Sequence, residues 1–383
     1  MKKMFQMGLP RRVIAGEGAT SEILNIVEES GLNNILLLAD GGAYKAGSIA
    51  KIEEMLSGFN VTLLNDSPPE PEYKQVLETY NRMKDNNIEM IVAVGGGSIM
   101  DTAKILSVIS TNPEYAKDLL NPSLIKKRGL LTIFVPTSAG TGSEATQNSI
   151  VVVPEKELKV GLVNSNFIPD YVILDAEMTI KLPPSVTAAT GVDAFCHAIE
   201  CYISKKANPF SDMYALKAIN LISKNLRKAY TDGSDISARE NMLLAAFYGG
   251  LCIASSSTVA VHALSYPLGG KYRIPHGVSN AILLPFIMEY NADHVLDKFR
   301  DVAIAMEINI ENRSKEEIGK LVVEEIFNLT KDLNIPNSLK EYGITSEDLD
   351  GLVEAAAGVT RLLDNNPKVM SKEDIRNIYM KLM

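Results

Sequence analysis

Histidine is rare in this chain, which has only four copies of it in 383 residues. His197 follows Asp193 by four positions in TGVDAFCHAIE, and a helix over this segment would place both side chains on one face. His262 and His276 stand at the two ends of HALSYPLGGKYRIPH. Three imidazoles and one carboxylate suit Fe(II) or Zn(II), and no thiolates are placed to favour copper(I) or an iron–sulfur cluster. We therefore predict one metal site built from these four residues.

Each histidine taken alone is more typical of a satisfied core or surface side chain, so the prediction depends on three of them together. We expect a helix of small residues, ASSSTVAVH, to lead into His262. After it, PLGGKYRIP is expected to loop the chain back to His276, at a point where side chains larger than Gly269 and Gly270 would obstruct the return. The fourth histidine, His294, is flanked by polar residues and is expected to be a solvated surface side chain.

A run of glycines marks the end of one expected strand. VAVGGGSIMDTAK places Gly95, Gly96, Gly97 and Ser98 between a buried strand and a helix. Glycines let a backbone pass close to a ligand, and the amino end of a helix favours an anion such as a pyrophosphate. Taken alone, the run fits a tight strand-to-helix turn equally well.

A second turn of small and hydroxyl-bearing residues follows another strand. In FVPTSAGTGSEAT these residues are Thr137, Ser138, Gly140, Thr141, Gly142 and Ser143. Two such turns at the strand ends of one sheet indicate a dinucleotide. Asp40, at the end of NILLLAD, could accept hydrogen bonds from an adenosine ribose and would repel a 2′-phosphate, which favours NAD over NADP. An aspartate that caps the following turn is the alternative.

The order of apolar and amphipathic segments indicates the fold. Apolar runs at 34–40, 61–65, 90–98, 131–138 and 171–175 predict buried strands, and helical spacing appears between them at 21–31, 74–87 and 98–111. This alternation predicts a doubly wound parallel sheet. After KLPPSVTAATG, long helical patterns dominate. We predict an α/β dinucleotide-binding domain over residues 1–180 and an all-helical domain over residues 181–383.

Composition excludes several classes of partner. The net charge is −9, and no dense run of Lys or Arg is available to follow a phosphate backbone, so we expect no nucleic acid. No apolar run approaches the roughly 20 residues that span a bilayer, and the segment before Pro10 lacks the apolar core of a secretory signal. Three cysteines without framework spacing are expected to be small buried residues. We expect a cytoplasmic homo-oligomer, with a dimer as the default.

The chain resembles the iron-dependent (group III) alcohol dehydrogenases along nearly its whole length. The segments that carry the resemblance are GGGSIMDTAK, VPTSAGTGSEAT, TGVDAFCHAIE, HALSYPLGGKYRIPHG and NNPKVMSKEDIRNIY. It implies a dehydroquinate synthase-like architecture with an NAD-binding α/β domain and a helical metal-binding and substrate domain. The implied metal ligands are Asp193, His197, His262 and His276. The implied cofactor contacts are Asp40, Gly95, Gly96, Gly97, Ser98, Asp101, Thr137, Ser138, Thr141, Asn148 and Lys159.

The resemblance also implies an activity. It is that of an NAD-linked alcohol dehydrogenase or aldehyde reductase, in which hydride passes between the nicotinamide and an alcohol whose oxygen the metal polarises. The alternative is an NAD- and metal-dependent lyase of the dehydroquinate synthase type, with no net redox change. The candidate catalytic residues are His262 and Tyr266, and the resemblance implies a small alcohol or aldehyde as substrate.

The chain departs from the family pattern in three ways. Many members have a histidine where this chain has Tyr266, which could relay a proton or pack over the nicotinamide. Many have an aromatic residue and an asparagine where this chain has Ile253 and Ser255, and an asparagine where it has Glu70. The serines at 255–257 could bind a polar or anionic group of the substrate, with helix-packing serines as the alternative.

Overall fold

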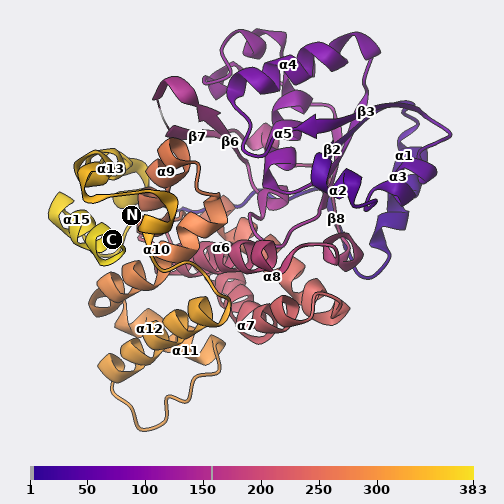
Figure 1. The fold of residues 1–383 in the computed structure, drawn as a ribbon. Helices are drawn as coiled ribbons and strands as arrows, with labels where there is room; N and C mark the ends of the chain where they lie inside the picture. Colours follow the sequence, from indigo (N-terminus) through magenta and orange to yellow (C-terminus); the bar gives the residue numbers. More distant parts are fainter. Residues whose placement is uncertain (1–3, 157) are drawn as a thin grey trace. The chain divides into compact units, whose positions relative to one another are not determined.

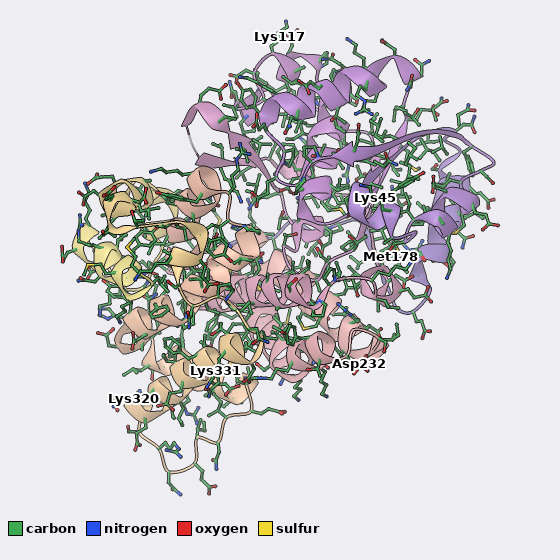
Figure 2. The ribbon with its side chains drawn as sticks, viewed as in Figure 1. Lys45, Lys117, Met178, Asp232, Lys320 and Lys331 are labelled. Carbon is green, nitrogen blue, oxygen red and sulfur yellow. The ribbon has the colours of Figure 1, made fainter. Side chains whose placement is uncertain are left out.

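The computed structural model describes residues 4–156 and 158–383 and divides them into two units (Figure 1). A sheet unit runs over Gly8–Leu182. A helical unit runs over Pro183–Met383 and includes residues 4–7. Charged side chains such as Lys117 in the sheet unit and Lys320 in the helical unit are exposed to solvent (Figure 2).

The sheet unit is built on six parallel strands. Their order across the sheet is β1-β8-β5-β4-β2-β3. The strands are β1 (Arg12–Ala15), β2 (Asn34–Asp40), β3 (Asn60–Ser67), β4 (Met90–Gly95), β5 (Leu131–Pro136) and β8 (Tyr171–Leu174). All neighbours pair in parallel. The predicted α/β fold with a parallel sheet is therefore confirmed.

Both faces of this sheet are covered, which explains why its strands appear as unbroken apolar runs. Ile35 and Leu37 of β2 point to the face covered by α1 (Glu22–Ser30) and α3 (Ala50–Met55). Leu36 and Leu38 point to the face covered by α4 (Tyr73–Met83) and α5 (Gly97–Thr111). Successive side chains of a strand alternate between faces, so helices on both sides require every position to be apolar.

Three strands were not predicted from the sequence. β1 lies at one edge of the sheet, is mostly exposed and has only four residues, RVIA, so its apolar run is too short to stand out. β6 (Asn148–Val153) and β7 (Leu158–Val163) form an antiparallel hairpin outside the main sheet. Alternate residues of β6 are buried, and the hairpin contributes Val151 and Leu162 to the core beneath α5. This hairpin carries two of the expected cofactor residues, Asn148 and Lys159.

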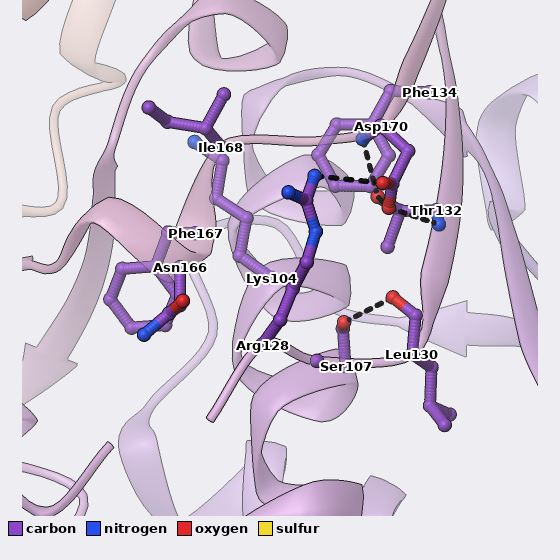
Figure 3. Close-up of a pocket in the computed structure, with 11 residues that line it drawn as sticks. Lys104, Ser107, Arg128, Leu130, Thr132, Phe134, Asn166, Phe167, Ile168 and Asp170 are labelled. Carbon is purple, nitrogen blue, oxygen red and sulfur yellow. Dashed lines mark hydrogen bonds and ion pairs between the residues drawn. The ribbon is translucent and has the colours of Figure 1, made fainter. Parts of the chain in front are cut away.

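A small pocket opens at the amino ends of β5 and β8 (Figure 3). Its polar groups are bonded to one another, because Asp170 accepts hydrogen bonds from Arg128 Nη2 (2.7 Å) and the Thr132 amide (3.1 Å), and Ser107 Oγ donates to the Leu130 carbonyl (2.8 Å). Parallel α/β sheets bind their ligands at the opposite edge, outside the carboxyl ends of the strands. The cofactor site is therefore expected at the glycine turns and not in this pocket.

The helical unit is organised around one buried helix. Its helices are α6 (Pro184–Ile203), α7 (Pro209–Thr231), α8 (Ile236–Ser255), α9 (Ala260–Tyr272), α10 (His276–Asn291), α11 (Leu296–Ala305), α12 (Lys315–Asp332), α13 (Leu349–Ala357), α14 (Thr360–Leu363) and α15 (Lys372–Lys381). α6 starts with a proline at its first turn, where no backbone donor is needed, and packs against α7, α8 and α10. In the described part of the chain no single helix is long and apolar enough to cross a membrane, and α8 and α9 pass that test only together, across a bend of 103°.

The chain before and after His262 differs from the expectation. The small-residue segment is a break between two helices, because α8 ends at Ser255 and α9 begins at Ala260. Serine hydroxyls in this segment donate to backbone carbonyls, which competes with helix continuation. The PLGG segment, expected as a loop, is part of α9. The return to His276 takes only residues 273–275, with Arg273 in the left-handed region at φ 55°.

Other sequence expectations are confirmed. All three cysteines are buried and free. His294 is exposed, with Nδ1 2.9 Å from a carboxylate oxygen of Asp293.

Gly277 lets α10 approach α6 closely. A Cβ at this position would lie 2.7 Å from the Ala189 carbonyl oxygen and 3.0 Å from its carbon, both backbone atoms of α6. Neither helix has room to yield there without shifting as a whole. Because His276 is the first residue of α10, this contact also places that imidazole next to α6.

Replacing Gly277 by alanine tests this packing. We expect Gly277→Ala to lower the free energy of unfolding by about 1–3 kcal/mol, the usual cost of overpacking. The matched control is Gly351→Ala in α13, where an added Cβ meets nothing within 4 Å. It should raise stability by up to about 1 kcal/mol through helix propensity. Urea unfolding of both variants gives the comparison, and equal effects would contradict the close contact.

Candidate functional site

Three helices of the helical unit bring the four predicted metal ligands together. Asp193 and His197 lie one turn apart on α6, His262 is on the first turn of α9, and His276 opens α10. One ligand atom from each lies within 4.8 Å of all the others. Asp193, His197 and His262 are buried, and the His276 side chain is 28% exposed. The cluster therefore has three enclosed members and one that reaches the surface of the unit.

The contacts of the Asn280 amide show that the lone pairs of three predicted ligands converge on one point. Its Nδ2 lies 2.6 Å from Asp193 Oδ1 and 3.2 Å from Nε2 of both His262 and His276. An amide nitrogen carries two protons and cannot satisfy three acceptors at once. Its Oδ1 is buried and has no hydrogen-bond partner. A divalent cation suits this donor set better than an amide does, so the residues present fit Fe(II) or Zn(II).

Glu200 fixes the orientation of His262. Its Oε2 lies 2.5 Å from His262 Nδ1, and its Oε1 accepts a hydrogen bond from the Val261 amide at 2.6 Å. A carboxylate at Nδ1 keeps the proton on that nitrogen and leaves Nε2 with a lone pair directed at the cluster. The sequence interpretation did not include Glu200. Its position seven residues after Asp193, on the same face of one helix, is the signal that could have found it.

Asp193 stays ionised although it is buried. Burial alone would raise the pKa of this carboxyl, but His197, His276 and His262, with the hydrogen bond from Asn280, hold the pKa below its ordinary value. Its charge is therefore available to a cation.

Tyr266 lies beside the cluster, one turn after His262 on α9. Its ring centroid is 6.3 Å from that of His276. Burial raises the pKa of the phenol, and the positive charge of Arg361 opposes that rise. The serines that precede α9 all donate to backbone carbonyls: Ser255 to Leu251 and Cys252, Ser256 to Cys201, and Ser257 to Thr258. These hydroxyl protons are therefore used within the protein, as in the helix-packing alternative, and are not directed at a substrate.

Glu200→Gln tests the orientation of His262. Loss of the charged acceptor should weaken metal affinity by about 10- to 100-fold, as is usual for carboxylates behind a metal-binding histidine. Competition with a chromophoric chelator measures the affinity. Asp175→Asn serves as the control, because Asp175 is also fully buried and accepts hydrogen bonds from Thr20, in the sheet unit. Both variants should lose stability, and loss of metal affinity in both would remove the specific role of Glu200.

The glycine turn and the hydroxyl-bearing turn of the sheet unit pack directly on each other. Gly95 ends β4, Gly96 caps α5 and Gly97 is its first residue. A Cβ on Gly97 would lie 2.7 Å from Thr141 Cγ2, and one on Gly96 would lie 3.3 Å from Ser138 Oγ. The glycines thus make room for the second turn, in addition to leaving the amino end of α5 accessible to a ligand.

Asp40 lies at the carboxyl end of β2 and binds within the protein. Its Oδ1 accepts from the Ala43 amide at 2.6 Å, which caps α2 (Gly41–Lys45). Its Oδ2 accepts from Thr137 Oγ1 at 3.4 Å, and the Thr137 amide donates to the Gly95 carbonyl at 3.0 Å. The capping alternative therefore occurs. The same carboxylate also links the ends of β2 and β5 through Thr137, at the edge where a dinucleotide is expected.

A buried ionic network lies beneath the hydroxyl-bearing turn. Lys104 Nζ donates to Ser143 Oγ (2.7 Å), Thr146 Oγ1 (3.0 Å) and the Asn148 carbonyl (2.6 Å). Asp101 accepts from Ser143 Oγ at 2.5 Å and from the Ile150 amide at 3.1 Å, so its side chain serves this network. Sequence reasoning missed Lys104, although a lysine in the mostly apolar stretch AKILSVI was a signal.

Burial governs the titration of this network. It lowers the pKa of Lys104 to about 8, although Asp101 and Glu144 oppose the shift. It raises the pKa of Glu144 to about 7. Loss of water around a charge favours the neutral form of either group.

Lys159, on β7, pairs with Glu70. Its side chain is 4% exposed, and Nζ lies 2.6 Å from Glu70 Oε1. Glu70 has a left-handed backbone at φ 53°, and its amide donates to Ser98 Oγ at 2.9 Å. The residue that departs from the family pattern thus connects the glycine turn to the hairpin.

Glu70→Gln should leave the buried Lys159 ammonium without a charged partner. We expect a loss of roughly 1–3 kcal/mol in the free energy of unfolding. Glu177→Gln is the matched control, because it removes the partner of Lys51, whose side chain is 79% exposed, and should cost less than about 0.5 kcal/mol. Chemical unfolding of the two variants measures the difference, and an equally small effect would show that the pair adds no stability.

Comparison with known proteins identifies the family. The iron-containing alcohol dehydrogenase family matches residues 10–176, and the C-terminal region of the Fe-containing alcohol dehydrogenase family matches residues 187–383. Long-chain-alcohol dehydrogenase 1 of Geobacillus thermodenitrificans is 36% identical, over 95% of this chain and 93% of its own length.

Two solved structures show the same architecture. The alcohol dehydrogenase from Oenococcus oeni superposes with a TM-score of 0.94 at 31% identity, over 99% of this chain and 100% of its own. Sulfoacetaldehyde reductase from Bifidobacterium kashiwanohense, solved in complex with NAD+, superposes with a TM-score of 0.87 at 27% identity, over 99% of both chains. The chain therefore belongs to the iron-containing alcohol dehydrogenase family.

Proposed function

We propose that this oxidoreductase interconverts a small alcohol and its aldehyde or ketone with NAD, using Fe(II) or Zn(II) held by Asp193, His197, His262 and His276. The convergence of the four donors on the Asn280 amide is the observation that carries the proposal. Asn280 Nδ2 has two protons for the three acceptors around it, and a divalent cation suits one carboxylate and three imidazoles better.

The bound groups supply the reactive chemistry and the chain supplies position. A divalent cation supplies Lewis-acid polarisation of an oxygen, and the nicotinamide supplies the hydride step. Glu200 keeps His262 in the tautomer with a free Nε2. His276, the partly exposed ligand, marks the side of the cluster that a substrate can reach. His262 acts as a metal ligand. Tyr266, one helical turn away, relays the proton of the substrate hydroxyl.

NAD is the proposed cofactor. The sulfoacetaldehyde reductase with the same fold binds NAD+. In this chain the amino end of α5 receives the pyrophosphate at Gly95–Ser98, and Thr137, Ser138 and Thr141 border it. Asp40 stands where a ribose would lie and disfavours a 2′-phosphate. Asp101 supports this region from below, and Asn148 and Lys159 lie on the hairpin beside it.

A redox reaction is better supported than the lyase alternative. The relatives described above are dehydrogenases and a reductase. Dehydroquinate synthase-like lyases give no net NADH, so the two activities are separable by one assay. The substrate we propose is polar or anionic.

Metal removal tests the proposed function. The protein is purified anaerobically, its metals are quantified by elemental mass spectrometry, and NADH absorbance is followed with a panel of aldehydes, diols and hydroxy acids. We expect stoichiometric metal, turnover that a chelator abolishes, and recovery with Fe(II) or Zn(II). A protein that binds metal but never changes NADH would favour the lyase, and one that binds no metal would overturn the assignment of the four ligands.

A further inference from the structure

An acidic residue lies beside the turn that we propose to receive the pyrophosphate. The Glu70 amide donates to Ser98 Oγ at 2.9 Å, and Ser98 is the second residue of α5. The free amide groups at the start of a helix attract an anion, and a nearby carboxylate opposes that attraction. The negative charge of Glu70 therefore disfavours a dinucleotide unless a cation balances it.

Lys159 provides that balance. Its Nζ donates to Glu70 Oε1 at 2.6 Å, and its side chain is 4% exposed against 31% for the side chain of Glu70. The ammonium thus lies on the inner side of the pair and the carboxylate on the side nearer solvent. Together the two groups present little net charge to a ligand, whereas a buried ammonium alone would attract a phosphate strongly.

Backbone contacts hold both members of the pair in place. The Pro71 carbonyl accepts from the Val152 amide of β6 at 3.1 Å, and Glu72 forms a parallel bridge with Val152. Val152 in turn faces Lys159 in the register of the hairpin. Glu70 and Lys159 therefore lie on neighbouring backbones, and these backbone contacts do not depend on either charged side chain.

The backbone of Glu70 does not require an acidic side chain. Its φ of 53° lies in the left-handed region, which favours glycine and asparagine. The carboxylate therefore contributes its charge and its contact with Lys159, and not the geometry of the turn.

We propose that Glu70 limits the affinity of the sheet unit for NAD by neutralising Lys159, so that the dinucleotide leaves readily after each turnover. The inference rests on the proposed function, because a dehydrogenase must exchange NAD for NADH in every cycle. A lyase without net redox change has no such need.

Removal of the Glu70 charge should strengthen the binding of a pyrophosphate. Calorimetric titration with ADP-ribose, which lacks the nicotinamide, measures the dissociation constant without turnover. Glu70→Gln should lower that constant by about 3- to 10-fold at low ionic strength, and by less at high salt. Glu70→Asn, which suits the left-handed backbone, should act in the same direction. Stopped-flow displacement should show that the gain is in slower dissociation.

Two controls separate this effect from net charge and from contacts that do not involve phosphate. Glu114→Gln removes the same charge from an exposed pair with Lys117, beyond the other end of α5 and about 20 Å along it at 1.5 Å per residue. It should leave the dissociation constant unchanged. Adenosine, which has no phosphate, should bind to Glu70→Gln as it does to the unmodified chain.

A double variant tests the charge balance. Lys159→Gln alone should raise the dissociation constant of ADP-ribose, because the carboxylate of Glu70 is then unbalanced. Glu70→Gln combined with Lys159→Gln should return it to within about threefold of the unmodified chain. A double variant that binds as weakly as Lys159→Gln would overturn the inference, since the carboxylate would then have no effect of its own.

The sign of the change separates the inference from a purely structural role. The loss of stability expected for Glu70→Gln would weaken binding if it disturbed the site, and the predicted change is in the opposite direction. Weaker or unchanged binding of ADP-ribose by the folded Glu70 variants would overturn the inference and leave the dehydrogenase intact. Failure of ADP-ribose to bind to any of these proteins would count against NAD as the cofactor, and the inference would fail with it.

Discussion

The helical unit depends on the pairing of two carboxylates buried on one helix. Asp193 and Glu200 lie two turns apart on α6 and are 1% and 0% exposed. A buried ionised carboxylate costs several kcal/mol unless it is paired and hydrogen-bonded. Glu200 meets this condition through His262 and the Val261 amide, and Asp193 through Asn280 and the imidazoles. α9 and α10 must therefore stay close to α6.

Small residues make that closeness possible. Gly277 brings the start of α10 against the Ala189 backbone, and on α8 a Cβ at Gly249 would lie only 3.3 Å from His197 Cβ. Helices in contact at such points cannot slide without separating the ligand atoms. The helices that carry the metal ligands are the same helices that pack against each other in the core. The packing of the core therefore also sets the geometry of the metal site.

Sequence patterns predicted what depends on local periodicity. The central strands and α5 have burial on both faces, which produces unbroken apolar runs, and the spacing of Asp193 and His197 places them on one helix face. The pattern could not find β1, since its pairing with β8 is set by a distant segment. The β6–β7 hairpin pairs locally but lies outside the main sheet, so the alternation of strands and helices did not indicate it. The pattern misassigned the segment before His262, because serines that bond to backbone carbonyls end a helix in spite of their small size.

Local sequence patterns also could not identify the polar residues that support the site. Glu200, Asn280 and Lys104 share helices with predicted residues, but their partners lie on other elements: His262 for Glu200, Asp193 for Asn280, and Thr146 for Lys104. A helical spacing of four or seven residues shows which side chains share a face. It does not show what that face meets, and that is what decides whether a buried charge is tolerable.

Charge matching keeps two buried lysines of the sheet unit in supporting roles. Lys104 Nζ lies 3.6 Å from an Asp101 carboxylate oxygen, and Lys159 Nζ lies 2.6 Å from Glu70 Oε1. Because each positive charge is already balanced within the protein, binding of an anionic ligand adds little electrostatic stabilisation.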